Sequence, residues 1–255
     1  HLETCDPTDM IDLEDLAVCL ALDREEPPAP AAQALRQVDC GEAANAGALS
    51  FSLFDGRSWA EVEKAYALRV QEALQGSSPS VTVYNAGVRS NTTANARARF
   101  AKDVLAHKPR VVVIQFGIND AAVDVWANPP ATKSRVSLAD YEKNLRWMIA
   151  ALREQKIAPV LMTTNPTRWT SRLRELYGKP PYRPDEADGF DAPVLSHYNE
   201  AVRKLAKELA VPLVDVHAAF SKKNPDKLLL DGMNPNDDGH QITAELLVPI
   251  MRDAL

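Results

Sequence analysis

The sequence predicts an α/β fold in which helices cover both faces of one parallel β-sheet. Short apolar runs typical of buried strands alternate with longer amphipathic stretches, and this alternation gives successive right-handed βαβ units in a doubly wound sheet. The run 111–116 has five apolar residues out of six, too short for a helix and suited to a strand buried on both faces. With 255 residues, 45% of them hydrophobic, we predict a single domain, 1–255.

The first 56 residues form a divergent N-terminal segment whose structure the pattern leaves open. Residues 9–21 suit an acid-capped helix, whereas residues 17–22 suit a short buried strand. Residues 48–54 alternate apolar and small polar side chains, as a strand would. An interior slot of the predicted sheet has to be filled from this segment, because strand edges would otherwise stay unpaired.

From residue 57 onward the elements follow one another regularly. Apolar residues at helical spacing predict a first helix through residues 59–74, and a Gly-Ser-Ser-Pro stretch ends it. After it we predict strands at 81–84, 111–116, 159–162 and 212–215, and helices at 93–106, 138–152, 194–209 and from about 240 to 255.

Residues 165–193 form a long excursion rich in Pro, Arg and Asp, with Trp169, Tyr177 and Tyr182 interspersed. A loop of this length inside a compact domain is usually functional, so we predict a lid or a ligand-binding loop. An ordered surface flap without a ligand role is the alternative.

Small polar side chains gather where the predicted strands end. They lie in residues 85–93 after one strand, at Asn119 and Asp120 after the central strand, and in residues 231–240 before the last helix. In open α/β sheets ligands bind outside the carboxyl ends of the strands, which predicts a site here. Turn formation and helix capping would also explain Asn119 and Asp120.

Several function classes lack their sequence signals. Gly-rich dinucleotide and triphosphate motifs, metal-ligand spacings and the Gly-x-Ser-x-Gly elbow are absent from the sequence, so we expect no cofactor and no metal. A net charge of -6 and a pI near 5.4 argue against a nucleic-acid partner. The sequence contains no run of 18 apolar residues, so we predict no membrane span.

Compartment and oligomeric state stay open. The three cysteines, Cys5, Cys19 and Cys40, form neither a zinc nor a redox pattern, although one disulfide with one free thiol fits them. The chain begins at His1 without a charged-then-apolar leader, which indicates a processed or trimmed form and is compatible with a secreted or periplasmic protein.

The three strand-end blocks resemble blocks two, three and five of the SGNH (GDSL-type) hydrolases, and the resemblance covers about residues 57–255 in the correct order. It implies a flavodoxin-like three-layer fold with about five strands in the order 2-1-3-4-5, and an esterase without a cofactor. In that family a serine attacks the ester, a histidine is the general base and an aspartate orients it. The oxyanion is held by backbone N–H groups and by the asparagine of block three, roles that the resemblance gives to Ser90 and Asn119.

Block five departs from the family pattern at its base. Asp231 stands where the family has its orienting aspartate, but Asn234 replaces the histidine three residues later. A carboxamide cannot accept and return a proton near neutral pH, so this position cannot act as a general base. His240 is the candidate substitute, with an ordinary histidine at a helix start as the alternative. If His240 is the base, we expect the rate to rise between about pH 6 and 7.

Block one is not recognisable, because no Gly-Asp-Ser occurs. Ser50, in Ser50-Phe51-Ser52, resembles the nucleophile block loosely, but residues 43–48 before it make a poor strand. Residues 18–22 make a better strand and would put Asp23 where the serine is expected.

Three interpretations follow. The chain is an esterase acting on small acyl esters such as O-acetylated glycans, or an inactive relative that binds a glycan or small ligand, or an enzyme whose first 56 residues are foreign to the fold.

Overall fold

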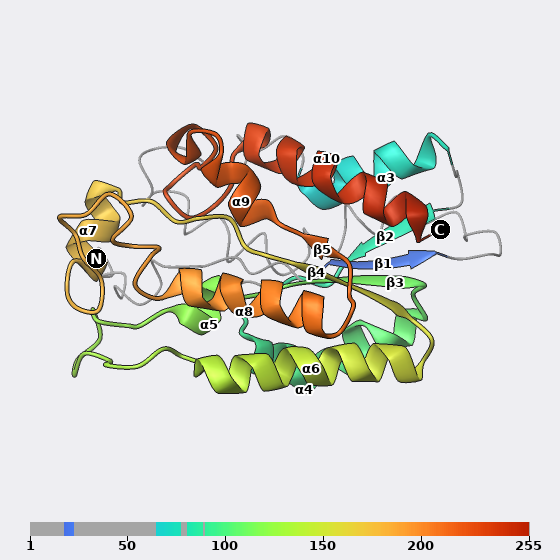
Figure 1. The fold of residues 1–255 in the computed structure, drawn as a ribbon, viewed down its shortest axis with the longest axis horizontal. Helices are drawn as coiled ribbons and strands as arrows, with labels where there is room; N and C mark the ends of the chain where they lie inside the picture. The colour runs from blue at the N-terminus through green and yellow to red at the C-terminus, as the bar shows by residue number, and fades with distance from the viewer. Residues whose placement is uncertain (1–17, 23–64, 78–80, 89, 255) are drawn as a thin grey trace, which may run out of the picture.

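The computed structural model describes residues 18–22, 65–77, 81–88 and 90–254, and within them five strands form one sheet (Figure 1). Their order is β2-β1-β3-β4-β5, which is the predicted 2-1-3-4-5 order. The strands are β1 (Val18–Leu22), β2 (Val81–Asn85), β3 (Val111–Gln115), β4 (Ala158–Met162) and β5 (Leu213–Val214). The interior slot is thus filled by β1, within the strand predicted at 17–22, and the other candidate strand, beside Ser50, lies outside the described residues.

The direction of β1 differs from our prediction. β3 pairs in parallel with β4, and β4 with β5, but β1 runs antiparallel to both β2 and β3. The prediction of a wholly parallel sheet is therefore wrong for β1, because an apolar run does not encode direction and antiparallel ladders pair the backbone equally well. Leu22 pairs with Val81, so the carboxyl end of β1 lies at the amino end of β2. Asp23, which comes next in the sequence, lies outside the described residues.

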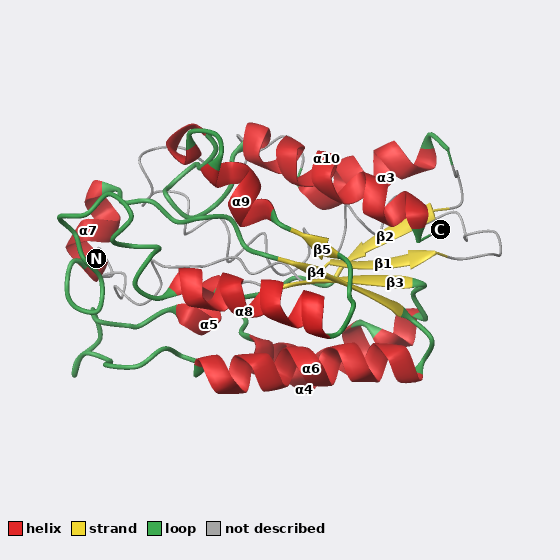
Figure 2. Cartoon of the chain, viewed as in Figure 1, coloured by secondary structure: helices red, strands yellow, loops and turns green. Residues whose placement is uncertain are grey.

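Helices lie on both sides of the sheet (Figure 2). On one side are α3 (Tyr66–Gln75), α9 (Val216–Ser221) and α10 (Asp237–Asp253), and on the other are α4 (Thr93–Asp103), α5 (Ile118–Ala121), α6 (Leu138–Glu154) and α8 (Leu195–Glu208). Within the described residues, the connections also contain the short 3-10 helices η3 (Leu105–His107) and η4 (Pro225–Lys227). The three-layer arrangement predicted for the chain is confirmed.

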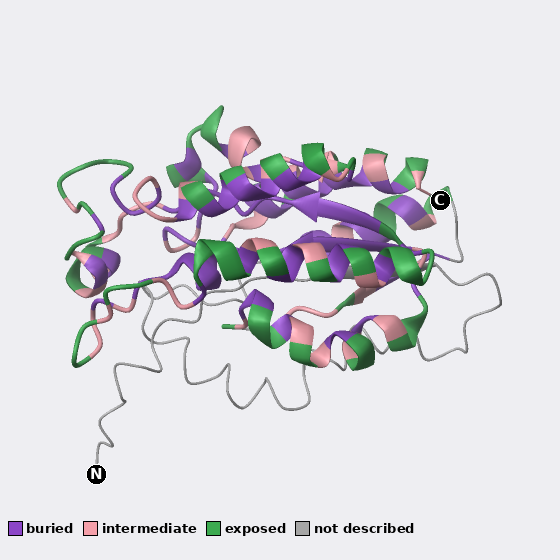
Figure 3. Cartoon of the chain, turned by 60° about the horizontal axis from the view of Figure 1, so that its bottom comes forward, coloured by how far each residue is buried: buried purple, intermediate pink, exposed green. Residues whose placement is uncertain are grey.

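The central strand divides the core. All five residues of β3 are buried. Val112 and Ile114 pack with α4, α6 and α8, whereas Val111 and Val113 pack with α3 and α10. Each such side chain stabilises the fold by roughly 1.5–3 kcal/mol on burial. Figure 3 shows the result, with the sheet buried and the outer helix faces exposed.

Two helices near the site begin at polar caps. Thr92 caps α4 in a capping box with Asn95, and Ser137 accepts a hydrogen bond from the Asp140 backbone N–H at the start of α6. Such caps are worth about 1 kcal/mol each, and the first one fixes where the block-two loop ends.

The predicted loop at 165–193 contains a helix that the sequence analysis did not foresee, α7 (Ser171–Tyr177). Thr170 caps it, and Leu173 and Tyr177, four residues apart, bury their side chains on one face. Tyr177, Tyr182, Phe190 and Trp169 pack their rings together, with centroid separations of 4.8–6.5 Å. We call residues 165–193 the lid segment, and its aromatic rings belong to the same core cluster as the side chains of α4, α6 and α8.

Candidate active site

The loops after β2 and β3 are joined by a buried carboxylate. Asp120 is fully buried and accepts hydrogen bonds from the Thr93 backbone N–H at 3.0 Å and from the Thr93 hydroxyl. Burial raises the pKa of Asp120 to about 6, although the hydrogen bonds from Thr93 work in the opposite direction. Asn144 on α6 donates to the Thr93 hydroxyl at 2.9 Å. Blocks two and three are therefore brought together.

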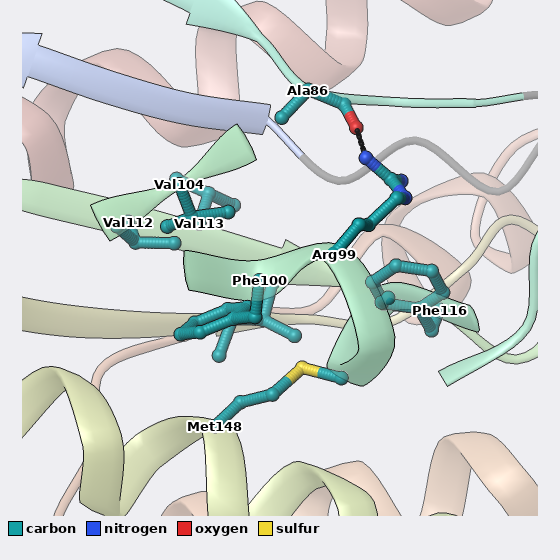
Figure 4. A pocket seen from close by; sticks show the side chains of 10 residues that line it. Ala86, Arg99, Phe100, Val104, Val112, Val113, Phe116 and Met148 are labelled. Atoms are coloured by element: carbon teal, nitrogen blue, oxygen red, sulfur yellow. Dashed lines mark hydrogen bonds between the residues drawn. The ribbon is translucent and has the colours of Figure 1, made fainter. Parts of the chain in front are cut away.

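Ser90 lies in a loop whose two ends are held by one arginine. Arg99 donates from Nη1 to the Ala86 carbonyl at 2.8 Å and from Nε to Asn91 Oδ1 at 3.0 Å. Ser90 itself has φ 59°, a left-handed conformation uncommon for a residue with a Cβ. Figure 4 shows Arg99 reaching Ala86 at the rim of an apolar pocket between α4 and β3. The pocket is lined by Ala86, Ala96, Arg99, Phe100, Val104, Val112, Val113, Ile114, Phe116 and Met148.

Asn119 lies in the first turn of α5, directly after the central strand, and its side chain is fully buried. The chain leaves β3 through Gly117 at φ 147°, a backbone conformation that strains residues with a side chain. Arg135 Nη1 donates to Asn119 Oδ1 at 2.8 Å. The oxygen of the Asn119 amide is therefore bound by Arg135.

Asp231 and Asn234 form a pair within one turn. Asp231 Oδ1 accepts from the backbone N–H of Asn234 at 2.8 Å, and Asp231 Oδ2 accepts from Asn234 Nδ2 at 2.8 Å. The second bond is the one that the N–H of a histidine would make to its orienting carboxylate. The pair thus keeps the geometry of a base and its carboxylate, with a carboxamide in place of the imidazole.

A shallow apolar pocket connects these loops. Ile118, which precedes Asn119, and Met233, which precedes Asn234, both line it together with the lid residues Tyr177, Tyr182 and Phe190. Asn165 Nδ2 also donates to the Met233 carbonyl at 2.7 Å, joining the loop after β4 to block five. The loops after β3 and β4, block five and the lid segment therefore adjoin one pocket, and block two is linked to them through the bonds of Thr93 to Asp120.

His240 lies in the first turn of α10. Its ring packs near Tyr66 on α3, and its Nδ1 accepts from the Tyr66 backbone N–H at 3.4 Å. Burial lowers the pKa of His240 to about 4. The predicted rise in rate between pH 6 and 7 would therefore move to about pH 4, and the role of His240 as a base stays a prediction.

This burial gives a test of stability against pH. His240 stays neutral in the folded chain down to about pH 4, whereas the unfolded chain protonates it near 6.5. The unfolded state then binds more protons, so lowering the pH from 6.5 to 4 should cost the parent about 3 kcal/mol of unfolding free energy relative to His240→Gln. Urea unfolding at several pH values measures this. His197→Gln, at an exposed position on α8, is the matched control, and parallel curves for the parent and His240→Gln would contradict the expectation.

The sequence analysis missed a second histidine near the strand ends. His217, after β5, hydrogen bonds through Nε2 to Asp191 Oδ2 at 3.0 Å, and Asp191 also accepts from the Thr167 backbone N–H at 3.0 Å. Asp215, which caps α9, binds Arg203 at 2.8 Å. No local motif marks these residues, because the partners lie 12 to 26 positions apart. The bonds among Thr167, Asp191 and His217 hold the two ends of the lid segment together and attach them to the body of the fold.

Other expectations meet the structure only in part. Ser50, the candidate nucleophile, lies outside the described residues. Among the residues that are described, no helix has both the length and the apolar character needed to cross a membrane.

Comparison with known proteins places these features in a family. The model of the GDSL-like lipase/acylhydrolase family matches residues 52–242, which include blocks two, three and five and begin two residues after Ser50. The uncharacterized lipoprotein YqeF of Bacillus subtilis (strain 168) is 32% identical over 168 residues, covering 63% of this chain and 67% of that protein. An acetylxylan esterase of Geobacillus stearothermophilus is 28% identical over 215 residues, covering 81% and 85%.

A solved structure agrees with the sequence comparison. A catalytic mutant of Axe2, an acetylxylan esterase from Geobacillus stearothermophilus, superposes with a TM-score of 0.56 at 26% identity, over 73% of this chain and 80% of that one. Catalytic mutants of Axe2 replace a serine, an aspartate and a histidine three positions after that aspartate. Because the family match spans most of the sequence, the chain belongs to the GDSL-like lipase/acylhydrolase family of ester hydrolases.

Proposed function

We propose that the chain hydrolyses small acyl esters, with O-acetyl groups on carbohydrate as the substrate class. The observation that carries the proposal is the meeting of the strand-end loops: Thr93 binds Asp120, and the neighbours of Asn119 and Asn234 line one pocket. The acetylxylan esterases among its relatives support an acetylated glycan as substrate.

In the proposed reaction the hydroxyl of Ser50 attacks the ester carbonyl. The negative charge that develops on the carbonyl oxygen is held by the backbone N–H of Ser90 and by the side-chain NH₂ of Asn119. With no base in place, the proton of Ser50 passes to solvent water and a solvent proton reaches the leaving alkoxide, so collapse of the intermediate releases the alcohol and leaves an acyl-serine, which water then hydrolyses to the acid and free serine. Donors aimed at the developing charge are typically the largest single contribution to such catalysis.

Asn234 limits the rate in this proposal. Its spacing from Asp231 equals that between the aspartate and histidine replaced in the Axe2 mutants, which supports the base position for Asn234. Its NH₂ donates to Asp231 but cannot take the proton from Ser50. We therefore expect slow turnover in the parent chain.

Release of p-nitrophenol from the acetate, butyrate and octanoate esters tests the proposal. We expect the acetate to react fastest and Ser50→Ala to abolish release, while Ser52→Ala, two positions away, keeps it. Release of acetate from acetylated xylooligosaccharides tests the glycan class. Glycan binding without release of acid from any of these esters would overturn the proposal. It would favour the ligand-binding alternative, which is a candidate because Asn234 occupies the position of the base.

A further inference from the structure

A side-chain amide serves as an oxyanion donor only in one of its two orientations. Rotation by 180° about the last side-chain bond exchanges the oxygen and the NH₂ of asparagine, and the two orientations have nearly the same shape. If the oxygen of Asn119 faced the ester, it would repel the developing negative charge. A contact in the fold must therefore stabilise the orientation that presents the NH₂ of Asn119 to the ester.

The contact with Arg135 favours the orientation in which the oxygen of Asn119 faces the guanidinium. Arg135 Nη1 lies 2.8 Å from Asn119 Oδ1, and a guanidinium carries five N–H donors and no acceptor. Only the oxygen of Asn119 can therefore face Arg135 favourably. Since the side chain of Asn119 is fully buried, solvent does not compete for this oxygen.

Arg135 is itself held rigidly. Its Nε and Nη2 donate to the Asp124 carboxylate at 3.0 and 2.8 Å, the forked arrangement that fixes a guanidinium plane. Its backbone N–H donates to the Ala122 carbonyl at 2.9 Å. Burial alone would lower the pKa of Arg135, but the hydrogen bond and charge of Asp124 outweigh it and raise the pKa above its usual range. The arginine thus stays charged in a fixed place.

We propose that Arg135 is a positioning residue of the esterase site: it holds the carboxamide of Asn119 with its NH₂ toward the ester oxygen. The inference rests on the proposed function for its catalytic consequence, but the orientation it describes is measurable without turnover. Arg135 lies in the loop between α5 and α6, outside all the family blocks. A lysine would supply a single donor to Asn119 and lose the fork to Asp124.

Side-chain amide NMR of the full chain, labelled with ¹⁵N-asparagine, tests the orientation directly. The Asn119 signals are assigned by their loss in Asn119→Ser. We expect one sharp NH₂ pair in the parent, and a split or broadened pair in Arg135→Met as both orientations become populated. Arg146→Met is the matched control, because Arg146 also makes a two-point ion pair, with Glu208, on the exposed side of α6. Nuclear Overhauser contacts from the Asn119 NH₂ protons to the same neighbours in Arg135→Met as in the parent would overturn the proposal, whatever the line width.

Kinetics on p-nitrophenyl acetate test the consequence. Misorienting one oxyanion donor should lower kcat by about tenfold to a hundredfold in Arg135→Met while KM changes by less than about twofold. Arg135→Lys should recover part of the loss, and Arg146→Met should match the parent. Unchanged kcat in Arg135→Met would overturn the catalytic role. If the parent releases no product, the proposed function has failed, and the NMR result alone decides on Arg135. Should Arg135→Met not fold, Arg135→Lys takes its place in both measurements, with the same outcomes at smaller amplitude.

Discussion

Replacing Asn234 with histidine should raise kcat for p-nitrophenyl acetate by about a hundredfold to ten-thousandfold over the parent chain, the range that a positioned general base contributes. Asn234 Nδ2 already donates to Asp231 Oδ2 at 2.8 Å, so an imidazole at this position can make the same bond through Nδ1. Its Nε2 is then free to accept the proton of the nucleophile. Initial rates of p-nitrophenol release measure the change.

The gain should also depend on pH in a specific way. The imidazole works as a base only when neutral, so the rate of Asn234→His should fall as the pH drops below the pKa of the new histidine. The Asp231 carboxylate should keep that pKa at or above the usual value of about 6.5. The added catalysis should therefore be present above about pH 7 and lost on acidification.

Two further variants make this expectation specific. Asn236→His puts an imidazole two positions along the same loop, where the native side chain caps α10 rather than facing Asp231. It should give no gain in kcat. Combining Asn234→His with Asp231→Asn should remove most of the gain, because the imidazole then loses its orienting carboxylate. An equal rate for Asn234→His and Asn236→His would contradict a base position at 234.

Removing the side-chain donor of the proposed oxyanion site is expected to have the second large effect. Asn119→Ala should lower kcat by about a hundredfold to a thousandfold, with KM nearly unchanged, because the donor acts mainly in the transition state. It should also cost about 1–3 kcal/mol of unfolding free energy, since Arg135 loses its acceptor. Kinetics in both the parent and the Asn234→His background, together with urea unfolding, separate the two effects.

Asn199→Ala is the matched control for this substitution. Asn199 is also a buried asparagine, on α8, and its Oδ1 accepts from the Thr164 backbone N–H at 2.9 Å. Its replacement should cost stability without lowering kcat by more than about threefold, since it donates nothing to the proposed oxyanion. A comparable fall in kcat for both variants would mean that general loosening, rather than a missing donor, explains the effect of Asn119→Ala.

The sequence predicted well the strands marked by a continuous apolar run and the helices long enough to show periodicity. The apolar run at 111–116 fixed the central strand, and the stripe through 138–152 fixed α6, because both patterns report burial directly. The short α9 was not foreseen, since six residues are too few for helical periodicity to appear. The direction of β1 was mispredicted because side-chain alternation is the same in either direction.

Some residues of the candidate site could be predicted from the sequence and others could not. Ser90, Asn119 and Asp231 stand in blocks whose order and spacing can be read along the chain. Arg135 could not be selected from the sequence, because its proposed role depends on a contact with Asn119, 16 positions away. Nothing in the sequence distinguishes it from other arginines in polar loops. The burial that lowers the pKa of His240 comes from the packing of α10 against α3, which local pattern does not report.

The closure of the lid segment at its base has a consequence for engineering. Thr167 and Asp191 are hydrogen bonded to each other, and His217 ties Asp191 to the body, so the segment leaves and re-enters the fold at nearly one point. We expect that residues 168–190 can be exchanged at this junction for the corresponding stretch of another family member, provided that the contacts of Tyr177 and Tyr182 with the loop after α5 are replaced. The grafted stretch would have to bring apolar rings of its own to replace Tyr177, Tyr182 and Phe190 beside Ile118. The lid segment can thus vary between members of the family, and the range of substrates with it, while the loops at the strand ends keep their structure.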